Sequence, residues 1–283
     1  MNPIEAIPIQ ALTVELCTAG SLDSLLAGVA HRKTCPYTIL AQAVQGRYEI
    51  TCGDGRHETL AEGEAFLTGA NLPLHILHHG DPKKAFRMRA RWIHIHFTIF
   101  GALDVTSLLA LPLRVTRRQG EPFAAVIEAL LQDRQTPKTS VAWLAHRHEL
   151  AFRALRLLGE LAPWRENALE RLRHKDRLEP VLAFMKEHLA DTLTVADLAR
   201  KANLSPPRFH AFFRELMGRS PMHHLKQLRL SEACRLLAAD REPLRVVAAK
   251  SGFCNEFHLS REFRAVFGKP PGGWRREYDR NLA

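Results

Sequence analysis

Cysteine is scarce in this chain, and the patterns missing around it exclude several classes of protein. The 283 residues include five cysteines, an odd number, and no two of them form a Cys-x-x-Cys pair. This excludes a disulfide framework and the usual zinc-ribbon and thiol redox motifs, and it favours reduced thiols in a cytoplasm. No apolar run reaches membrane-spanning length, and no positive stretch followed by an apolar core opens the sequence. We therefore expect a cytoplasmic protein with neither a signal peptide nor a membrane partner.

Acidic residues are outnumbered by basic ones, and the imbalance is uneven along the chain. The net charge is +10, from 40 Lys and Arg against 30 Asp and Glu. From Leu178 onward, 18 Lys and Arg stand against 12 Asp and Glu, a net charge of +6, whereas the 177 residues before it carry +4. The length suggests about two domains. The denser basic charge of the C-terminal part suits a partner with a phosphate backbone.

Two similar helical patterns follow each other in the last third of the chain. The first is LTVADLARKANLSPPRFHAFFREL, residues 193–216, and the second is PLRVVAAKSGFCNEFHLSREFRAVFG, residues 243–268. Aligned on their apolar positions, they place Asn203 opposite Gly252. A tight turn between two helices needs one residue at positive φ, which Gly and Asn supply most easily. The apolar positions recur at helical spacing, so the pair predicts two helix-turn-helix units in tandem.

Residues at the expected helix boundaries support this interpretation. Thr194 and Asp197 have the form of a capping box at the start of the first unit. Ser205 followed by Pro206 predicts an N-cap and an N1 proline for the first recognition helix, and Asn255 is placed to cap the second. Between the units, the sequence predicts an amphipathic connecting helix. This helix covers residues 221–240, with apolar side chains at Leu225, Leu228, Ala233, Leu236 and Leu237.

The connecting helix and the second unit together contain a recognisable set of residues. In the connecting helix they are Pro221, Leu225, Arg229-Leu230, Ala233 and Leu236-Leu237. In the second unit they are Gly252-Phe253, Ser260-Arg261, Phe263-Arg264, Phe267-Gly268, Pro271 and Trp274-Arg275. This set resembles the pattern of the AraC/XylS family of bacterial transcription regulators. The sequence departs from it at Asn203, where the family often has Gly, and at Phe257, where a small polar residue is commoner.

The resemblance implies a sequence-specific DNA-binding transcription regulator, and not an enzyme. It implies promoter DNA, double-stranded, as the partner of the tandem units, and a small-molecule effector bound in the N-terminal domain. Activation is the commoner mode in the family and is favoured over repression here, which would make RNA polymerase a further partner. A sugar is the effector class that the family suggests. No cofactor is implied.

The face of each recognition helix opposite its apolar positions is the face expected to meet DNA. Arg261 is the strongest candidate for base readout, because arginine can donate two hydrogen bonds to guanine O6 and N7. Other outward-facing cations are expected on phosphates, which position the protein without reading sequence; a solvated helix face is the alternative for any one of them. By resemblance the base-facing residues are Pro207, His210 and Ala211, then Glu256, Phe257 and Arg261. The set expected at DNA also contains Arg208, Arg214, Asn255, His258 and Arg264, and Lys226 is expected on a phosphate.

The N-terminal part has a different pattern. From Pro36 to Phe100, short alternating segments are broken by Gly, Asp and Pro, which predicts antiparallel strands in a small barrel or jelly roll. The stretches Gly63-Glu64-Ala65-Phe66-Leu67 and Pro73-Leu74-His75 resemble the second half of a cupin motif, as found in sensor domains of the same family. The predicted fold class is therefore α+β, with an N-terminal cupin-like antiparallel β-barrel with helices and a C-terminal all-α domain that holds two helix-turn-helix units.

One predicted strand carries an aromatic side chain and two histidines on a single face. Period-two alternation places Trp92, His94 and His96 together, and His75 is expected nearby. These residues predict a ligand pocket in which Trp92 stacks on a flat or sugar-like molecule. A barrel interior whose histidines bond to backbone carbonyls is the alternative. The competing function is a metal-dependent cupin enzyme that uses His75, His94 and His96, but the first cupin metal motif is absent in its usual order, and we expect no metal.

Two amphipathic helices, residues 122–135 and 141–161, are predicted between the barrel and the tandem units. By resemblance, helices here form the dimer interface of a homodimer; packing within one chain only is the alternative. The stretch RENALERLRHKDR predicts a solvated linker. The apolar stripe of the second helix consists of Leu144, Leu150, Phe152, Leu155, Leu158 and Leu161. The predicted domains are ligand-sensing and dimerisation over residues 1–163, a linker over 164–177, and DNA binding over 178–283.

Overall fold

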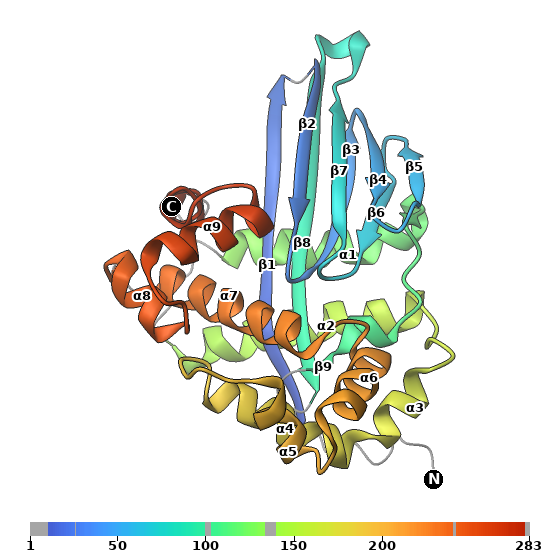
Figure 1. Ribbon diagram of the computed structural model, residues 1–283. Coiled ribbons are helices and arrows are strands. Elements are labelled where there is room, and N and C mark those ends of the chain that lie inside the picture. The colour runs from blue at the N-terminus through green and yellow to red at the C-terminus, as the bar shows by residue number, and fades with distance from the viewer. Residues whose placement is uncertain (1–10, 26, 100–102, 134–139, 240–241, 281–283) are drawn as a thin grey trace. The chain divides into compact units, whose positions relative to one another are not determined.

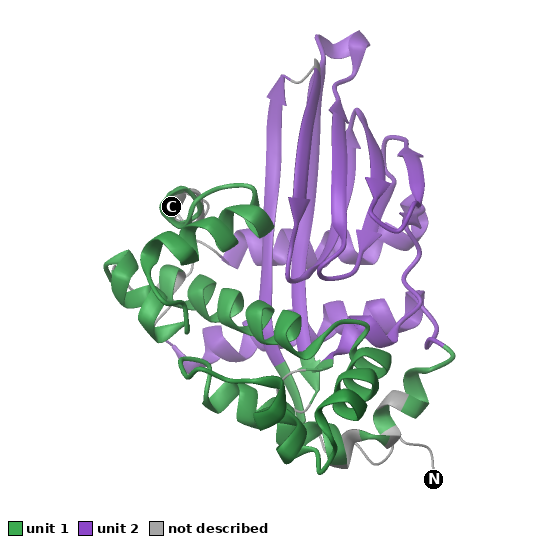
Figure 2. Ribbon diagram, in the orientation of Figure 1, with its two compact units in different colours: residues 1–13, 98–103, 166–283 green, residues 14–97, 104–165 purple. Residues whose placement is uncertain are grey.

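A computed structural model describes residues 11–25, 27–99, 103–133, 140–239 and 242–280, and Figure 1 shows their helices and strands. Figure 2 divides the chain into two compact units. The β unit consists of Val14–Phe97 and Asp104–Arg165, and the helical unit consists mainly of Glu166–Ala283. None of the helices in the described ranges combines the length and the apolarity that crossing a bilayer requires. The domain limits drawn from the sequence stay a prediction.

The β unit contains two antiparallel sheets, as predicted for a barrel or jelly roll (Figure 1). In the larger sheet the strand order is β1-β8-β3-β6-β10, and β9 pairs with β8; in the smaller sheet the order is β2-β7-β4-β5. The strands begin before Pro36, where the predicted region starts, and Phe100 lies outside the described residues. The larger sheet is built from β1 (Leu12–Leu25), β3 (Thr38–Gln45), β6 (Ala65–Thr68), β8 (Arg87–Ile99), β9 (Leu103–Asp104) and β10 (Arg114–Val115). The smaller sheet is built from β2 (Ala27–Thr34), β4 (Arg47–Cys52), β5 (His57–Leu60) and β7 (Pro73–His79).

The core of the β unit lies between the two sheets. Side chains from both sheets form one buried apolar cluster, to which Ile39 and Met88 contribute from the larger sheet and Ile50 and Ile76 from the smaller one. Because successive side chains of a strand point to opposite faces, alternate residues of each strand belong to this interior. The register therefore decides which polar residues face inward.

Two helices of the β unit follow the strands. The second, α2 (Val141–Leu161), has the predicted bounds. The first, α1 (Arg117–Gln132), begins five residues before the predicted start at Pro122, and residues 134–135 lie outside the described part. A capping box between Thr116 and Gln119 sets the observed start, so that Pro122 lies inside the helix and does not open it.

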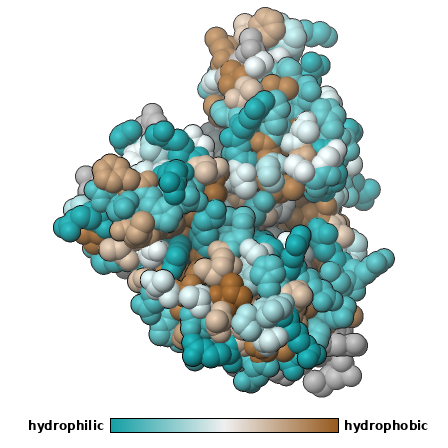
Figure 3. Space-filling model, viewed as in Figure 1, coloured by the Kyte–Doolittle hydropathy of each residue, from teal (hydrophilic) through white to brown (hydrophobic). Residues whose placement is uncertain are grey.

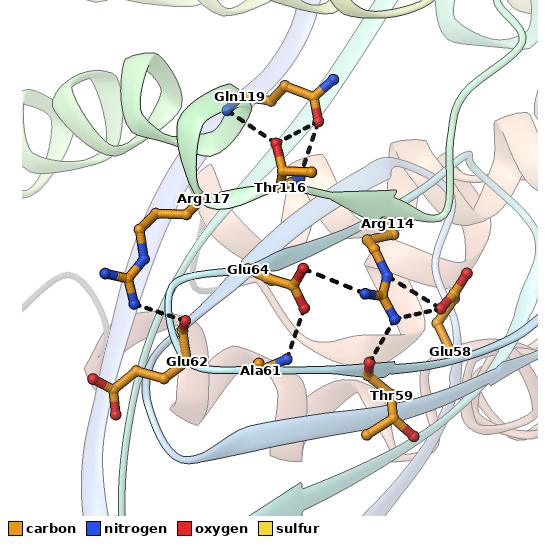
Figure 4. Close-up of polar contacts among 9 residues, drawn as sticks. All are labelled: Glu58, Thr59, Ala61, Glu62, Glu64, Arg114, Thr116, Arg117 and Gln119. Carbon is orange, nitrogen blue, oxygen red and sulfur yellow. Dashed lines mark hydrogen bonds and ion pairs between the residues drawn. The ribbon is translucent and has the colours of Figure 1, made fainter.

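Arginines at the junction of β10 and α1 bind β5 and the loop between β5 and β6 (Figure 4). The Arg114 guanidinium donates to Glu58 Oε2 at 2.8 Å and to the carbonyl oxygen of Thr59 at 2.9 Å, and it lies 3.4 Å from Glu64 Oε1. Arg117 donates to the carbonyl oxygen of Glu62 at 2.9 Å. These bonds attach the start of α1 to one end of the β5–β6 segment. The hydrogen bond to Glu58 raises the pKa of Arg114 most, and the negative charge of Glu64 raises it further.

The helical unit has the predicted order of two helix-turn-helix units around a connecting helix (Figure 1). The connecting helix ends at Ala239, and Asp240 lies outside the described residues. In the segment predicted as a linker, a short helix buries Ala168 and Leu172. The helices are α3 (Ala168–Arg173), α4 (Lys175–Glu187), α5 (Val195–Lys201), α6 (Pro206–Met217), α7 (Pro221–Ala239), α8 (Leu244–Lys250), α9 (Glu256–Phe267) and α10 (Pro271–Arg280).

Capping in the helical unit follows the sequence at two of three positions. Thr194 and Asp197 form the predicted capping box, and the Asn255 side chain accepts a hydrogen bond from the His258 amide at 2.8 Å. Ser205 occupies the N-cap position of α6, but its side chain makes no capping bond there. One reason is chemical, because the two residues that follow it are prolines and offer no backbone N–H.

The two turns adopt the predicted left-handed conformation for different reasons. Asn203 has φ 54° and Gly252 has φ 79°. A Cβ on Gly252 would overlap the carbonyl oxygen of Leu189, which follows α4, and would also meet the guanidinium of Arg229 from α7. That guanidinium donates from Nε to the Leu189 oxygen at 2.9 Å. The second turn therefore requires glycine for space as well as for its backbone angle.

Gly252→Ala is expected to lower the free energy of unfolding of the helical unit by about 2–4 kcal/mol. The added methyl group would be strained by the positive φ and would displace backbone next to α4. Urea denaturation followed by circular dichroism measures the change. Gly272→Ala is the matched control, because its Cβ would meet only the tip of the Arg276 side chain at 3.8 Å. Equal stability of the two variants would contradict this account of the turn.

Candidate nucleic-acid interface and barrel interior

The first recognition helix, α6, separates buried from exposed side chains as predicted. Phe209 and Phe213 are fully buried, and their rings lie 5.5 Å apart between centroids. Phe212 is half-buried and packs edge-on against His174, at 5.5 Å. The side chains expected at DNA all lie on the exposed part of the helix: Pro207, Arg208, His210, Ala211 and Arg214.

The second recognition helix, α9, has the same organisation. Leu259, Phe263 and Phe267 are buried in a cluster with side chains of α7 and α8. Phe257 is 79% exposed and the Arg261 side chain is 74% exposed. The other residues expected at DNA lie around them: Asn255 and Arg264 are exposed, and Glu256 and His258 are half-buried.

An acidic residue of α9, Glu262, links this helix to α7. The sequence alone did not predict this link. Glu262 accepts a hydrogen bond from Lys226 Nζ at 3.1 Å, and its other carboxylate oxygen lies 3.4 Å from Arg261 Nε. The bond from Lys226 is the largest cause that lowers the pKa of Glu262, and the bond from Arg261 lowers it further. No local pattern signals such a pair, because 36 residues separate Lys226 from Glu262.

Figure 3 shows the hydropathy of one face of the molecule. The visible face is mostly hydrophilic, and apolar residues are scattered among polar ones. The apolar recognition-helix residues that face the cores are buried, while the outward-facing positions carry cations, histidines and the exposed Phe257. A positively charged helix face with polar and aromatic side chains is suited to a DNA groove.

In the β unit, Trp92 and His94 face the interior between the two sheets. Trp92 packs on the buried cluster, and its ring occupies the space that a side chain on Gly20 of β1 would fill. His94 stacks on Tyr37, with ring centroids 4.6 Å apart and planes 27° from parallel. His96 is two residues further along β8, on the same face, and is half-buried. Three of the four predicted ligand-binding residues therefore share one face.

The fourth predicted residue, His75, lies on the other face of its strand. Its neighbours Leu74 and Ile76 are buried in the interior cluster, so His75 points away from it, and it pairs with the exposed Thr51. The expectation that His75 lies beside Trp92 is therefore wrong. The error is one of strand register, since a shift of one residue exchanges the faces.

The structure brings a different histidine to the interior. His78 pairs with the buried Tyr48 across β7 and β4, and the two rings lie 4.9 Å apart. His78 and His79 are the last residues of β7. Lys33 of β2 pairs with Leu74 and so belongs to the same inner face. Burial lowers the pKa of His78 to about 4 and that of His94 to about 3, and the positive charge of Lys33 contributes to both shifts.

The set of three imidazoles that a metal-dependent enzyme would need is not assembled. His75 is on the outer face, whereas His94 and His96 are on an inner one. Across the ranges that the structure describes, no group of three or more His, Cys, Asp or Glu side chains is arranged to hold a metal ion. The proposed ligands of the competing enzyme function therefore do not form one site.

The family described as a helix-turn-helix domain matches residues 198–277. The chain is similar to the MmsAB operon regulatory protein of Pseudomonas aeruginosa, with 31% identity over 115 residues, which are 41% of this chain and 35% of the relative. It is similar to the arabinose operon regulatory protein of Escherichia coli, with 30% identity over 126 residues, 43% of each chain. With the transcriptional activator RhaS of an Enterobacter species it shares 31% identity over 137 residues, 48% of this chain and 49% of the relative.

The solved structures extend the comparison to the whole fold. ToxT from Vibrio cholerae matches with a TM-score of 0.59 and 11% identity, over 94% of this chain and 98% of that chain. Wild-type ToxT with a bound unsaturated fatty acid matches with a TM-score of 0.56 and 11% identity, over 92% and 94%. At this identity the likeness shows the fold alone. The matches to the three curated relatives, by contrast, span less than half of each relative's length.

Fold and site together define a tandem helix-turn-helix protein with an N-terminal β domain. Two similar units, each with its own buried core and an exposed recognition helix, are joined by one connecting helix. Residues 198–277, which match the helix-turn-helix family, resemble the corresponding part of the AraC/XylS regulators, and the similar operon regulatory proteins support this resemblance. The resemblance inferred from the motif residues and the α+β fold class are thereby confirmed.

His94→Gln is expected to reduce the loss of stability on acidification. Burial lowers the pKa of His94 from its ordinary value of 6.5, which applies in the unfolded chain, to about 3 in the folded protein. The stability that depends on neutral His94 is therefore fully present above pH 6.5 and is lost as the pH falls toward 3. The difference at pH 5 is on the order of 1–2 kcal/mol.

Melting temperatures at pH 7.5 and pH 5 measure this effect. The flattening is partial, because His78 has a lowered pKa with the same sign and stays in the variant. His146→Gln, at an exposed position of α2, is the control for the replacement of a histidine by glutamine. An unchanged pH dependence in His94→Gln would mean that His94 is not held neutral by burial.

Proposed function

We propose that this protein is a sequence-specific DNA-binding transcription regulator. The observation that carries the proposal is the duplicated unit in which a buried aromatic core holds an exposed recognition helix, α6 in one copy and α9 in the other. The names of the similar proteins, which are operon regulators and an activator, support it. The two recognition helices enter major-groove segments about one helical turn apart.

Base readout is assigned to the exposed side chains near the start and middle of each recognition helix. Arg261 donates to guanine O6 and N7. Phe257, which is 79% exposed, makes an apolar contact of the kind that a thymine methyl group offers. His210 supplies the polar contact in the first helix, where Pro207 and Ala211 have only apolar surface to present.

Phosphate contacts are assigned to the remaining exposed cations of the two helices. Arg208 and Arg214 belong to α6 and Arg264 to α9, and all three are exposed. Their contribution to binding is electrostatic and independent of sequence, so it weakens as salt increases. Lys226 differs from them, because its ammonium group is already hydrogen-bonded to Glu262.

The regulator is proposed to activate transcription, with RNA polymerase as partner, and to have no enzymatic activity. RhaS, one of the similar proteins, is named as an activator. A protein that acts on promoters works where the chromosome is, so the proposal places it in the cytoplasm. A metal-dependent enzyme is not proposed, because the histidines it would use, His75, His94 and His96, do not face one another.

A homodimer is proposed through α2. Val141, Leu144 and Phe152 are exposed apolar residues of this helix, at 84%, 50% and 40%. Their spacing places them on one side of a helix with 3.6 residues per turn. A second copy that packs there would bury this surface, whereas the stripe residues Leu150 and Leu158 already pack within the chain.

The barrel interior is proposed to bind the effector. Trp92, His94 and Tyr37 offer aromatic surface, and Lys33 supplies a positive charge on the inner face. This lining suits a molecule with a flat or apolar part and an acidic group; the sugar suggested by the family stays a prediction. ToxT has been solved with an unsaturated fatty acid bound. A ligand raises the melting temperature by mass action, so no shift with acids or sugars would favour a barrel that serves only dimerisation.

In vitro selection from random and genomic DNA with the purified full-length protein tests the regulator proposal. Enrichment of a bipartite motif whose boxes lie about ten base pairs apart is the expected result. The enriched genomic sites would also identify the regulated promoters. Failure to enrich any motif would refute sequence-specific binding and with it the proposed function.

Arg261→Ala is expected to relax preference at about one base-pair position and to cost ~1–3 kcal/mol on the selected site. The guanidinium reads a base edge in the proposal, so its removal erases discrimination there and leaves other positions unchanged. Binding titrations against all four base pairs at each position measure this. Equal binding of variant and wild type to the selected site would refute the role of Arg261.

Arg214→Ala is expected to weaken binding to all sequences alike. Loss of one phosphate contact should reduce the slope of log K against log salt concentration by about 1. Fluorescence anisotropy from 50 to 300 mM salt, on the selected site and on unrelated DNA, measures both effects. A changed base preference in this variant would show that Arg214 reads sequence.

A further inference from the structure

Glu262 places a negatively charged carboxylate on α9, the recognition helix that is proposed to bind DNA. The phosphates of DNA repel such a charge, so the acid needs an explanation. Its side chain is 20% exposed. One oxygen, Oε2, accepts from Lys226 Nζ of α7 at 3.1 Å. The other, Oε1, lies 3.4 Å from Arg261 Nε and 4.0 Å from His258 Nε2. The carboxylate therefore joins the connecting helix to two side chains of the candidate DNA-binding face.

An ionised acid at this place opposes binding to phosphates in general. The bonds from Lys226 and Arg261 hold the pKa of Glu262 below its ordinary value, so the group is charged at neutral pH. Packing of α9 does not depend on it alone, because Leu259, Phe263 and Phe267 already anchor the helix in the core. The groups whose positions depend on this acid are the two cations that it binds, Lys226 and Arg261.

Specific binding to DNA makes different demands on these two cations: Arg261 should be ordered for contact with a base, and Lys226 should be kept from contact with phosphates. Arg261 has a long side chain that is 74% exposed, and ordering such a side chain on binding costs conformational entropy. A hydrogen bond that orders its guanidinium before binding removes part of that cost. Lys226, by contrast, is a point charge that would attract any phosphate, and its bond to Glu262 offsets this attraction.

We propose that Glu262 is a specificity-determining positioning residue, which orients Arg261 for base readout and withholds Lys226 from non-specific contact with phosphate. This inference rests on the proposed function, since it presumes that α9 reads DNA. It adds a residue that contacts no base itself and that acts through its two neighbours.

Glu262→Gln tests the proposal in the full-length protein. Glutamine keeps the size of the side chain and removes its charge. The ratio of affinity for the selected site to affinity for unrelated DNA should fall about tenfold, with the loss concentrated at the base pair read by Arg261. The slope of log K against log salt should steepen by about 1 on unrelated DNA, because Lys226 becomes available to a phosphate.

Two further variants test whether the effects of Glu262→Gln depend on the contact between Glu262 and Lys226. Glu232→Gln removes an acid of similar exposure, 24%, that bonds Arg235 on the same helix α7; it should leave the affinity ratio and the base preference unchanged. The double variant Glu262→Gln with Lys226→Ala should return the salt slope to the wild-type value while the loss of base preference persists. Circular dichroism and melting temperature confirm that each variant is folded.

The outcomes separate this inference from the function on which it rests. If the wild type selects no DNA motif, the proposed function fails. If the wild type binds its motif and Glu262→Gln behaves like Glu232→Gln, the function stands and the role of Glu262 is refuted. If Glu262→Gln raises affinity for both DNAs by the same factor, the acid acts only by charge and the positioning role is refuted.

Discussion

The arrangement of the helical unit depends on one partly buried contact, that of the Arg229 guanidinium beside the second helix-turn-helix turn. From α7 it donates to the carbonyl oxygen of Leu189 at 2.9 Å and to that of Asp191 at 2.7 Å, both beyond the end of α4. Gly252 lies against the same oxygen of Leu189. The end of α4, the middle of α7 and the α8–α9 turn are thereby joined. The contact explains physically why the family pattern contains an arginine and a glycine at these positions.

As a consequence, the exposed side chains of the recognition helices contribute little to holding these helices in place. Phe213 and Phe263 occupy equivalent buried positions in the two units. Because the cores and the Arg229 contact hold the helices, exposed positions such as His210 and Phe257 are available to a partner. Glu262 is the exception, since it links the outer face of α9 back to α7. Discrimination between DNA sequences is proposed to depend on this link.

The β unit has a different constraint, which is the register between its strands. In β7 the side chains of Leu74, Ile76 and His78 face the core, and His75 does not. On β8, Trp92 and His94 face inward because Met88 and Ala90 do. The sequence assigned the faces of β8 correctly, since the alternation lies within one strand. The prediction for His75 was wrong, because β7 and β8 belong to different sheets. The sequence of neither strand specifies which of their faces point toward the same interior.

Local chemistry by itself determined the tandem units, the box at Thr194, the cap at Asn255 and the positive φ of Asn203 and Gly252, because each depends on residues close together in the chain. The outward residues of both recognition helices followed from the 3.6-residue period. Only the tertiary structure decided that His78 replaces His75 at the interior, that Gly252 is needed for space beside Leu189, and that Lys226 is bound by Glu262. Those three depend on contacts between segments distant in sequence, which no local period or capping rule encodes.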